Sequence, residues 1–247
     1  MKFTAVAFDL DGTLYPAYRL NFRIIPFILK EQRLLRTLGR ARKQLRISGA
    51  YDGDFYDLQA KLMAGILGQP AAEIKERTER LIYRGWEPLF EKIKLFPHVR
   101  ETLAAFRKEG ITMGLLSDFP PKKKLEYMNI SEYWDAVVCS EETGRLKPDP
   151  APFLELARLM KRPPEEILYV GNSVSYDVKG AGGVGMKTAL VRPLWRKCFS
   201  AGNTASRARS ISARSISNGS EASLSSKETG PDFVFYDYRQ LFDYVLH

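Results

Sequence analysis

The sequence predicts an α/β fold: a parallel, doubly wound sheet with a block of helices inserted after its first strand. Over residues 97–191, short apolar runs alternate with amphipathic segments. That alternation is typical of strands buried in a parallel sheet and of the helices that connect them. Residues 16–96 instead have apolar residues at helical spacing and no strand-like alternation.

The first strand ends in two carboxylates. An apolar run, Val6 to Phe8, leads into Asp9 and Asp11, and Gly12 begins a turn. Ligands bind at the carboxyl ends of strands in open α/β sheets, so these acids are candidate site residues. An ordinary Asp-Gly turn or a helix cap has the same local sequence. The choice between these interpretations depends on what the other strand ends contribute.

The inserted block is expected to contain several helices. An apolar stripe begins at residue 24 and continues to 38. A break follows at 49–53, a second helix is expected over 54–67, and a third over 71–83.

The remaining segments supply the other strands and helices of the sheet. Buried strands are predicted at 111–116, 136–139, 167–170, 187–191 and 232–235. Helices are predicted at 99–107, 122–128, 151–160, 176–180 and 238–246. Residues 198–230 are rich in Ser and Arg with few large apolar side chains, so we expect a flexible insertion there.

The composition and charge of the chain indicate which partners and which cellular compartment we expect. The net charge of +9 is concentrated in residues 30–46 and 196–230. The first of these has little aromatic interleaving, so we expect a solvated helix face and no nucleic-acid partner. No apolar run approaches the about 20 residues of a membrane span, so no membrane partner is expected. The two cysteines, Cys139 and Cys198, make no disulfide framework, and the N-terminus does not resemble a signal peptide. We therefore expect a cytoplasmic protein.

Polar side chains follow four of the predicted strands. They are Asp9 and Asp11, Ser117, Lys147, and Asn172 with Asp177. If the strands are parallel, all of these face one edge of the sheet. Such a set suits a metal ion and a phosphate. One carboxylate can accept a phosphoryl group, a second can move a proton, and a hydroxyl and an ammonium can hold phosphoryl oxygens.

This set resembles the four motifs of the haloacid dehalogenase-like hydrolase superfamily. They are Asp9-Leu-Asp-Gly-Thr13, Ser117, Lys147-Pro-Asp-Pro150 and Gly171-Asn-Ser-Val-Ser-Tyr-Asp177. The resemblance implies a Rossmann-like α/β core, residues 1–15 and 97–247, with an inserted α-helical cap, residues 16–96. In this family the cap is mobile and shapes substrate choice.

The resemblance also implies roles for the motif residues. Asp9 would be the nucleophile that forms an aspartyl-phosphate, and Asp11 the general acid and base. Phosphate binding would fall to Ser117, Asp118 and Lys147. Mg²⁺ would be held by Asp9, the Asp11 carbonyl, Asn172 and Asp177. Dehalogenases of the family lack an acid at the position of Asp11, so its presence favours phosphate esters.

The expected activity is therefore Mg²⁺-dependent hydrolysis of a small phosphate monoester. Phosphoglycolate-like compounds and nucleoside 5′-monophosphates are the family-level candidates. A sugar phosphomutase, or a catalytically weak member that acts as a binding protein, are the alternatives. The binding-protein alternative is motivated by Asn172, since family phosphatases usually carry Asp there, and by the Ser- and Arg-rich insertion. Asn172 could also be a turn residue at a helix start.

Seven further residues, which lie outside the four motifs, are expected to have either a substrate-binding or a structural role. We expect Tyr15, Tyr18, Arg19 and Arg23 to be candidates for substrate contact, because they follow the nucleophile loop directly. We expect structural roles for His98, Trp86 and Trp134.

Overall fold

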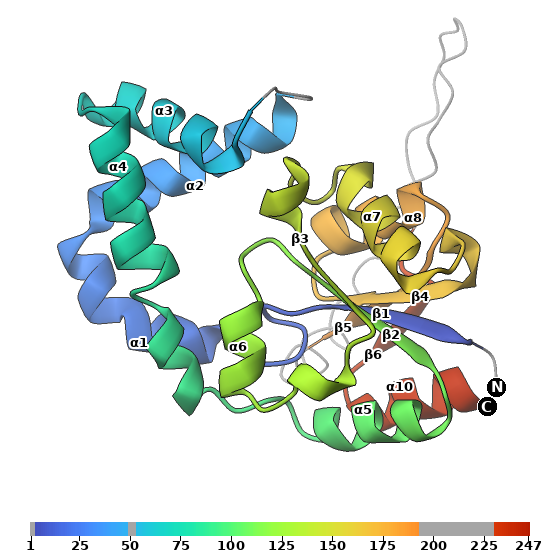
Figure 1. Ribbon diagram of the computed structural model, residues 1–247. Helices are drawn as coiled ribbons and strands as arrows, with labels where there is room; N and C mark the ends of the chain where they lie inside the picture. The colour runs from blue at the N-terminus through green and yellow to red at the C-terminus, as the bar shows by residue number, and fades with distance from the viewer. Residues whose placement is uncertain (1–2, 49–52, 193–229) are drawn as a thin grey trace, which may run out of the picture.

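A six-stranded parallel sheet organises the larger part of the molecule (Figure 1). The computed structural model describes residues 3–48, 53–192 and 230–247. The strand order is β3-β2-β1-β4-β5-β6, with β1 inside the sheet between β2 and β4. The strands are β1 Ala5–Asp9, β2 Thr112–Ser117, β3 Ala136–Cys139, β4 Ile167–Gly171, β5 Lys187–Val191 and β6 Phe233–Phe235. The predicted α/β fold and all six predicted strands are confirmed.

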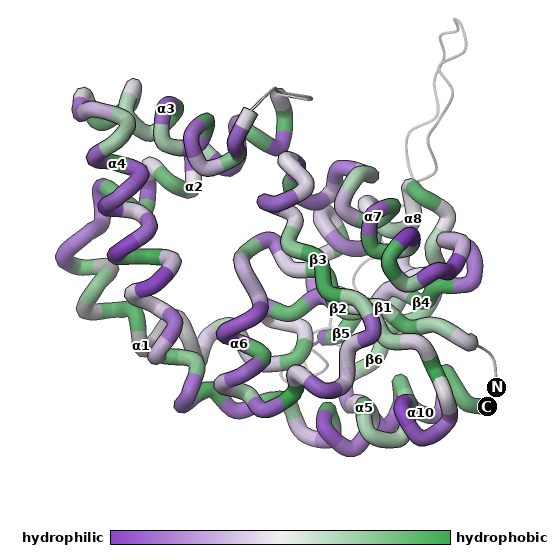
Figure 2. The backbone as a smooth tube through the Cα atoms, in the orientation of Figure 1, coloured by the Kyte–Doolittle hydropathy of each residue, from purple (hydrophilic) through white to green (hydrophobic). Residues whose placement is uncertain are grey.

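Both faces of the sheet are covered by helices, as the continuous apolar runs require. On β1, Val6 and Phe8 face one layer of core, and Ala5 and Ala7 face the other. The first layer contains side chains of α5 (Val99–Lys108) and α10 (Tyr238–Leu246), and the second those of α7 (Pro150–Met160) and α8 (Lys179–Gly183). The tube in Figure 2 is green along much of the sheet, where these layers meet.

The segment between β1 and α5 in the sequence forms a separate group of helices. This group lies to one side of the sheet (Figure 1). Its helices are α1 Ala17–Lys30, α2 Gln32–Ile47, α3 Phe55–Leu67 and α4 Ala71–Thr78, followed by a π-helical turn Glu79–Tyr83 and a 3₁₀ turn Glu87–Lys92. We call residues 17–92 the helical block. Leu34, Leu38, Met63 and Ile74 belong to a core of its own. That this block is a mobile cap, and the domain limits at 15 and 97, stay predictions.

The limits of α3 follow from its sequence. Asp54 caps the helix by accepting a hydrogen bond from the backbone N–H of Asp57 at 2.9 Å. Gly68 ends it in the left-handed conformation, with φ of 67°.

In the described part of the chain, no helix is long and apolar enough to span a bilayer.

The remaining elements are short. They are α6 Lys122–Tyr127, the 3₁₀ turns Ser131–Tyr133, Ser140–Thr143 and Pro164–Glu166, and the π-helical turn Val174–Val178. The helix predicted at 176–180 is split between this turn and α8. The flexible insertion predicted at 198–230, with Cys198, lies outside the described residues except for Gly230, as does most of the break predicted at 49–53.

Candidate active site

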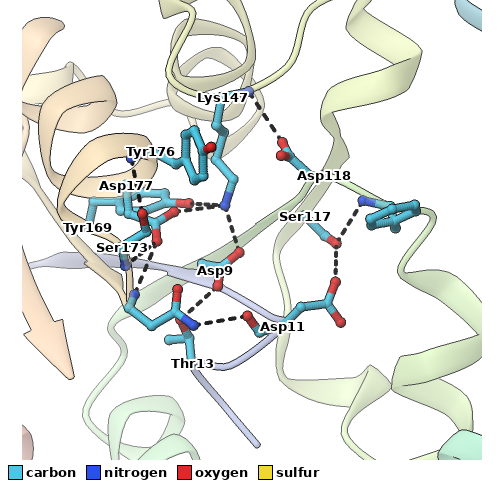
Figure 3. A network of polar contacts seen from close by, with 12 residues as sticks. Asp9, Asp11, Thr13, Ser117, Asp118, Lys147, Tyr169, Ser173, Tyr176 and Asp177 are labelled. Atoms are coloured by element: carbon cyan, nitrogen blue, oxygen red, sulfur yellow. Dashed lines mark hydrogen bonds and ion pairs between the residues drawn. The ribbon is translucent and has the colours of Figure 1, made fainter. Parts of the chain in front are cut away.

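The predicted strand ends meet at one edge of the sheet (Figure 3). Asp9 and Ser117 are the last residues of β1 and β2, and Asn172 follows β4 directly. Lys147 reaches the same place from the loop before α7, and Asp177 from the turn after β4. The parallel sheet thus brings together residues that are far apart in the sequence, as the pattern predicts.

Four buried side chains form what we call the inner cluster: Asp9, Thr13, Lys147 and Asp177. The Lys147 ammonium donates to Asp9 Oδ1 at 2.6 Å and to Asp177 Oδ1 at 2.8 Å. The Thr13 hydroxyl donates to Asp9 Oδ2 at 2.7 Å. Both oxygens of Asp9 are therefore held, and the carboxylate has one orientation at the strand end.

Burial dominates the electrostatics of the inner cluster. Desolvation is the largest cause that raises the pKa of Asp9, from 3.8 to about 7; Lys147 opposes it and Asp177 adds to it. For Lys147, neighbouring charges outweigh burial. Burial favours its neutral form, but the carboxylates of Asp177 and Asp9 hold the pKa of Lys147 well above its ordinary value.

A second group, which we call the outer cluster, surrounds the other acid of the turn: Asp11, Tyr15, Ser117 and Lys124. The Lys124 ammonium donates to both carboxylate oxygens of Asp11, at 2.8 and 2.7 Å. The Tyr15 hydroxyl donates to Asp11 Oδ1, and the Ser117 hydroxyl to Asp11 Oδ2 at 3.3 Å. Burial alone raises the pKa of Asp11, but Lys124 and Tyr15 together lower it below its ordinary value.

Lys124 is a site residue that the sequence reasoning missed. It follows Lys122 and Lys123 at the start of α6, where three consecutive lysines resemble a solvated surface. Only 8% of Lys124 is exposed, and its ammonium lies 5.1 Å from the centre of the Phe90 ring. Its position in the sequence could have identified Lys124 as a candidate. Because α6 begins a few residues after Ser117, its first turn lies close to the sheet edge.

Asn172 binds the loop that carries Asp11. Its Nδ2 donates to the backbone carbonyl of Asp11 at 3.1 Å. Gly12, with φ of 91°, leaves the space for this contact, since a Cβ at residue 12 would lie 2.0 Å from Asn172 Nδ2. Asp177 Oδ2 accepts the backbone N–H groups of Asn172 and Ser173, at 3.1 and 3.0 Å. These bonds set the conformation of the turn after β4.

The donor set at this edge fits Mg²⁺ in kind. Asp9 and Asp177 supply carboxylate oxygens, Asp11 a backbone carbonyl, and Asn172 an amide oxygen after a half-turn of its amide group. Among the described residues, no group of three or more His, Cys, Asp or Glu side chains could hold a metal ion by itself. Mg²⁺ does not need such a cage, because it keeps several waters and commonly binds one or two carboxylates together with a substrate phosphate.

Both carboxylate oxygens of Asp118 have partners in the structure. Its Oδ2 is paired with Arg46 at 2.6 Å, and its Oδ1 accepts the backbone N–H of Lys147 at 3.2 Å. Arg46 comes from α2, so Asp118 joins the helical block to the sheet edge. The phosphate-binding role of Asp118 stays a prediction, and this contact provides another role.

The expectation of a solvated basic face on α2 is wrong for two of its residues. Arg42 is 4% exposed, pairs with the buried Glu141, and donates to the backbone carbonyl of Asp118 at 2.9 Å. Arg46 also donates to the backbone carbonyl of Lys147, at 3.0 Å. Helical periodicity places both on one face, and that face docks on the core. The expected exposure is confirmed for Arg33, Arg36, Arg40 and Lys43.

The other side chains proposed for substrate contact are only partly described. Tyr15 is buried and belongs to the outer cluster. Tyr18 is 53% exposed. The side chains of Arg19 and Arg23 lie outside the described residues.

A cavity of about 420 Å³ opens beside the outer cluster, between the helical block and the sheet edge. Asp11, Tyr15 and Lys124 line it from the core side, and Tyr83 and Trp86 from the block. Its volume lies in the range of small-molecule sites. The Asp11 carboxyl thus lies at the wall of a ligand-sized space.

Comparison with known proteins identifies the family of this site. The family model for haloacid dehalogenase-like hydrolases matches residues 3–185. A glyceraldehyde 3-phosphate phosphatase of Methanopyrus kandleri is 30% identical over 203 residues, 76% of this chain and 83% of that protein. A phosphoglycolate phosphatase of Nitrosospira multiformis is 29% identical, over 73% of this chain and 79% of that protein.

Solved structures agree at the level of the fold. The crystal structure of a haloacid dehalogenase-type phosphatase from Thermococcus onnurineus superposes with a TM-score of 0.58. The two chains are 22% identical, and the match covers 100% of this chain and 98% of that one. The protein belongs to the haloacid dehalogenase-like hydrolase family and is an enzyme of that family.

Proposed function

We propose that this enzyme is a Mg²⁺-dependent phosphatase that hydrolyses a small phosphate monoester through an aspartyl-phosphate on Asp9. The observation that supports it best is the relation between the two acids. Asp9 is held by Lys147 and Thr13 at the end of the first strand. Asp11, two residues on, lines the cavity. The proposed proton carrier thus lies at the cavity wall, and the proposed nucleophile lies two residues before it, at the strand end.

The first half of the reaction transfers the phosphoryl group to the enzyme. A bond forms between an Asp9 carboxylate oxygen and phosphorus, and the bond between phosphorus and the ester oxygen breaks. The departing oxygen takes its proton from the Asp11 carboxyl. Although Lys124 and Tyr15 lower the pKa of Asp11, a phosphate dianion beside this carboxyl raises its affinity for a proton.

The second half returns the enzyme to its starting state. A water molecule gives a proton to the Asp11 carboxylate and attacks phosphorus. The bond between phosphorus and the Asp9 oxygen breaks, and inorganic phosphate leaves. Asp9 is again a carboxylate and Asp11 again an acid, so the cycle balances.

Positive charge and hydrogen-bond donors would stabilise the phosphoryl group during both halves. Lys147 contributes an ammonium and Ser117 a hydroxyl at the same sheet edge. Asp9, the Asp11 carbonyl, Asn172 and Asp177 are the residues that would hold Mg²⁺, which neutralises phosphoryl charge when bound. A cation there also favours the ionised form of Asp9, whose pKa of about 7 otherwise leaves much of it protonated near neutral pH.

The names of relatives bear on the substrate class. Two curated relatives act on glyceraldehyde 3-phosphate and phosphoglycolate, which supports a small phosphorylated metabolite as the substrate of this enzyme. A phosphoglycolate-like compound or a nucleoside 5′-monophosphate, the latter making it a nucleotidase, are the finer candidates. Cytoplasmic location and the absence of a nucleic-acid partner stay predictions.

Turnover of 4-nitrophenyl phosphate tests this proposal. We expect Mg²⁺-dependent release of inorganic phosphate that Asp9→Asn abolishes, while Asp57→Asn, at an exposed position on α3, keeps it. Release of free phosphate also separates hydrolysis from a phosphomutase, which returns the group to a sugar. Absence of any Mg²⁺-dependent turnover would contradict the proposal and favour a binding protein.

A further inference from the structure

The cavity beside Asp11 has a wall made largely of aromatic rings. Three of its residues, Tyr56, Tyr83 and Phe119, form a continuous row across the boundary between the helical block and the core. The ring centres of Tyr56 and Tyr83 are 5.4 Å apart, and those of Tyr83 and Phe119 are 6.0 Å apart. Tyr15 and Phe90 also line the cavity, and their rings are in edge contact, with centres 6.0 Å apart. Trp86 lines the same space.

Rings of this kind suit a planar, unsaturated ligand. Aromatic pairs add a favourable contribution beyond the burial of area when their centres lie about 4.5–7 Å apart. The spacing of rings around this cavity is of that order. A ligand ring that contacts these side chains at a similar spacing would extend the existing row.

The charges of the cavity lining bear on whether the ligand can carry a negative charge near the rings. The lining carboxylates are Asp11, Glu79 and Glu87. Within the described lining, the positive charge comes from Lys124, and both oxygens of Asp11 already accept its ammonium. Two of the three lining carboxylates are paired with cations: Asp11 with Lys124 and Glu79 with Arg84. In the described lining, a ligand carboxylate would therefore meet the like charge of Glu87 and no cation without an anionic partner. Burying such an unpaired charge is strongly unfavourable.

We propose that the cavity selects phosphate monoesters whose leaving group is an uncharged, planar aromatic unit. This inference rests on the proposed function for the phosphoryl chemistry, and names the substrate class of the same site. It disfavours phosphoglycolate, whose leaving group carries a carboxylate. The phosphoryl group would lie at Asp9, the ester oxygen at Asp11, and the ring among the aromatic residues of the wall.

Three synthetic esters test the proposal: benzyl phosphate, cyclohexylmethyl phosphate and 4-carboxybenzyl phosphate. The first two have leaving groups of similar size and basicity and differ in aromaticity. The first and third differ in one charge. We expect kcat/KM for benzyl phosphate to exceed that for cyclohexylmethyl phosphate about fivefold, and that for 4-carboxybenzyl phosphate about tenfold or more. Equal values, or faster turnover of the carboxylated ester, would overturn the proposal.

Two pairs of variants locate the effect. Phe119→Leu is expected to shrink the benzyl-to-cyclohexylmethyl ratio, whereas Tyr127→Leu, on α6 and outside the lining, leaves the ratio unchanged. Glu87→Gln is expected to raise relative turnover of the carboxylated ester, whereas Glu91→Gln, exposed and outside the lining, does not. Identical ratios in each variant and its control would contradict the assignment of the cavity.

Binding to the Asp9→Asn protein separates this proposal from the phosphatase proposal. Calorimetric titration with the three esters needs no turnover, and we expect the same order of affinity as of kcat/KM. If no ester and no 4-nitrophenyl phosphate is hydrolysed by the native enzyme, the phosphatase proposal fails while the affinity order still decides the cavity. If 4-nitrophenyl phosphate is hydrolysed but the affinity order is absent, only the present inference fails.

Discussion

The inner and outer clusters both pair a lysine with an aspartate, yet they shift the carboxyl pKa in opposite directions. In the inner cluster, burial and the second carboxylate of Asp177 outweigh Lys147, and the pKa of Asp9 rises to about 7. In the outer cluster, Lys124 and Tyr15 outweigh burial, and the pKa of Asp11 falls. Two acids that are two residues apart can thus have separate roles, because separate neighbours surround them.

The clusters also differ in where their residues come from. The inner cluster is built from the strand ends of the core and the segments that directly follow them. The outer cluster includes Lys124 from α6, whose ammonium lies near the Phe90 ring. It lines the cavity between the helical block and the sheet edge. We interpret the inner cluster as the part that performs phosphoryl transfer and the outer cluster as the part that adjusts proton transfer to the substrate.

The largest expected difference between the clusters is in rate. Asp9→Asn removes the proposed nucleophile, so kcat should fall about 10⁴-fold or more. Asp11→Asn removes only the proposed proton carrier and should lower kcat about 10²- to 10⁴-fold. Steady-state kinetics with 4-nitrophenyl phosphate and saturating Mg²⁺ measures both. A loss in Asp11→Asn that equals or exceeds that in Asp9→Asn would remove the distinction between the two acids.

The raised pKa of Asp9 predicts a pH dependence of stability in metal-free protein. The unfolded chain loses this proton near pH 3.8 and the folded chain near pH 7. The folded state therefore binds more protons between these values, and this carboxyl lowers the free energy of unfolding as pH rises through that window. Above about pH 7, Asp9 is ionised in both states, and its effect on the free energy of unfolding no longer changes with pH.

Asp9→Asn removes this titration, so its free energy of unfolding relative to wild type should increase from pH 4 to pH 8 by a few kcal/mol. Urea unfolding in the presence of EDTA measures the difference at each pH. Asp57→Asn, on the exposed face of α3, is the control and should show no such trend. A constant difference would mean that Asp9 is ionised throughout.

The sequence predicts the site residues at the strand ends well because β-strand ends have a simple signature. Apolar runs at Val6 to Phe8 and Leu115 to Leu116 lead directly to Asp9 and Ser117, and parallel pairing places them at one edge. The contacts of α2 and α6 are not predictable in the same way. The lysines 122–124 and the arginines of α2 match a solvated surface, and only the docking of those helices decides that Lys124 and Arg42 are buried.

Lys124→Met tests whether the outer cluster sets the proton affinity of Asp11. Loss of the ammonium should raise the pKa of Asp11, so the acid stays protonated to higher pH. The alkaline limb of the kcat/KM profile should therefore move to higher pH. Lys123→Met, whose lysine is paired with Glu126 at 2.7 Å on the exposed face, should leave the limb in place. An unmoved limb in Lys124→Met would show that Lys124 acts only in packing.

The smallest expected effect concerns Asn172, which bonds to the loop between the two clusters. Asp at this position cannot donate to the Asp11 carbonyl, so metal-free Asn172→Asp should lose about 1 kcal/mol of stability. The added charge should strengthen Mg²⁺ binding about tenfold. Thermal unfolding across a Mg²⁺ titration measures both quantities. Unchanged Mg²⁺ affinity would show that residue 172 is a turn residue and not a metal ligand.

The most direct test of the account is to find the phosphoryl group on the enzyme. Native protein turning over 4-nitrophenyl phosphate is quenched in acid, digested, and examined by mass spectrometry. We predict a phosphoryl group on the peptide that contains Asp9, localised to its carboxyl group, and absent from Asp9→Asn. Phosphorylation of another residue, or turnover with no covalent phosphate on Asp9, would contradict the central claim.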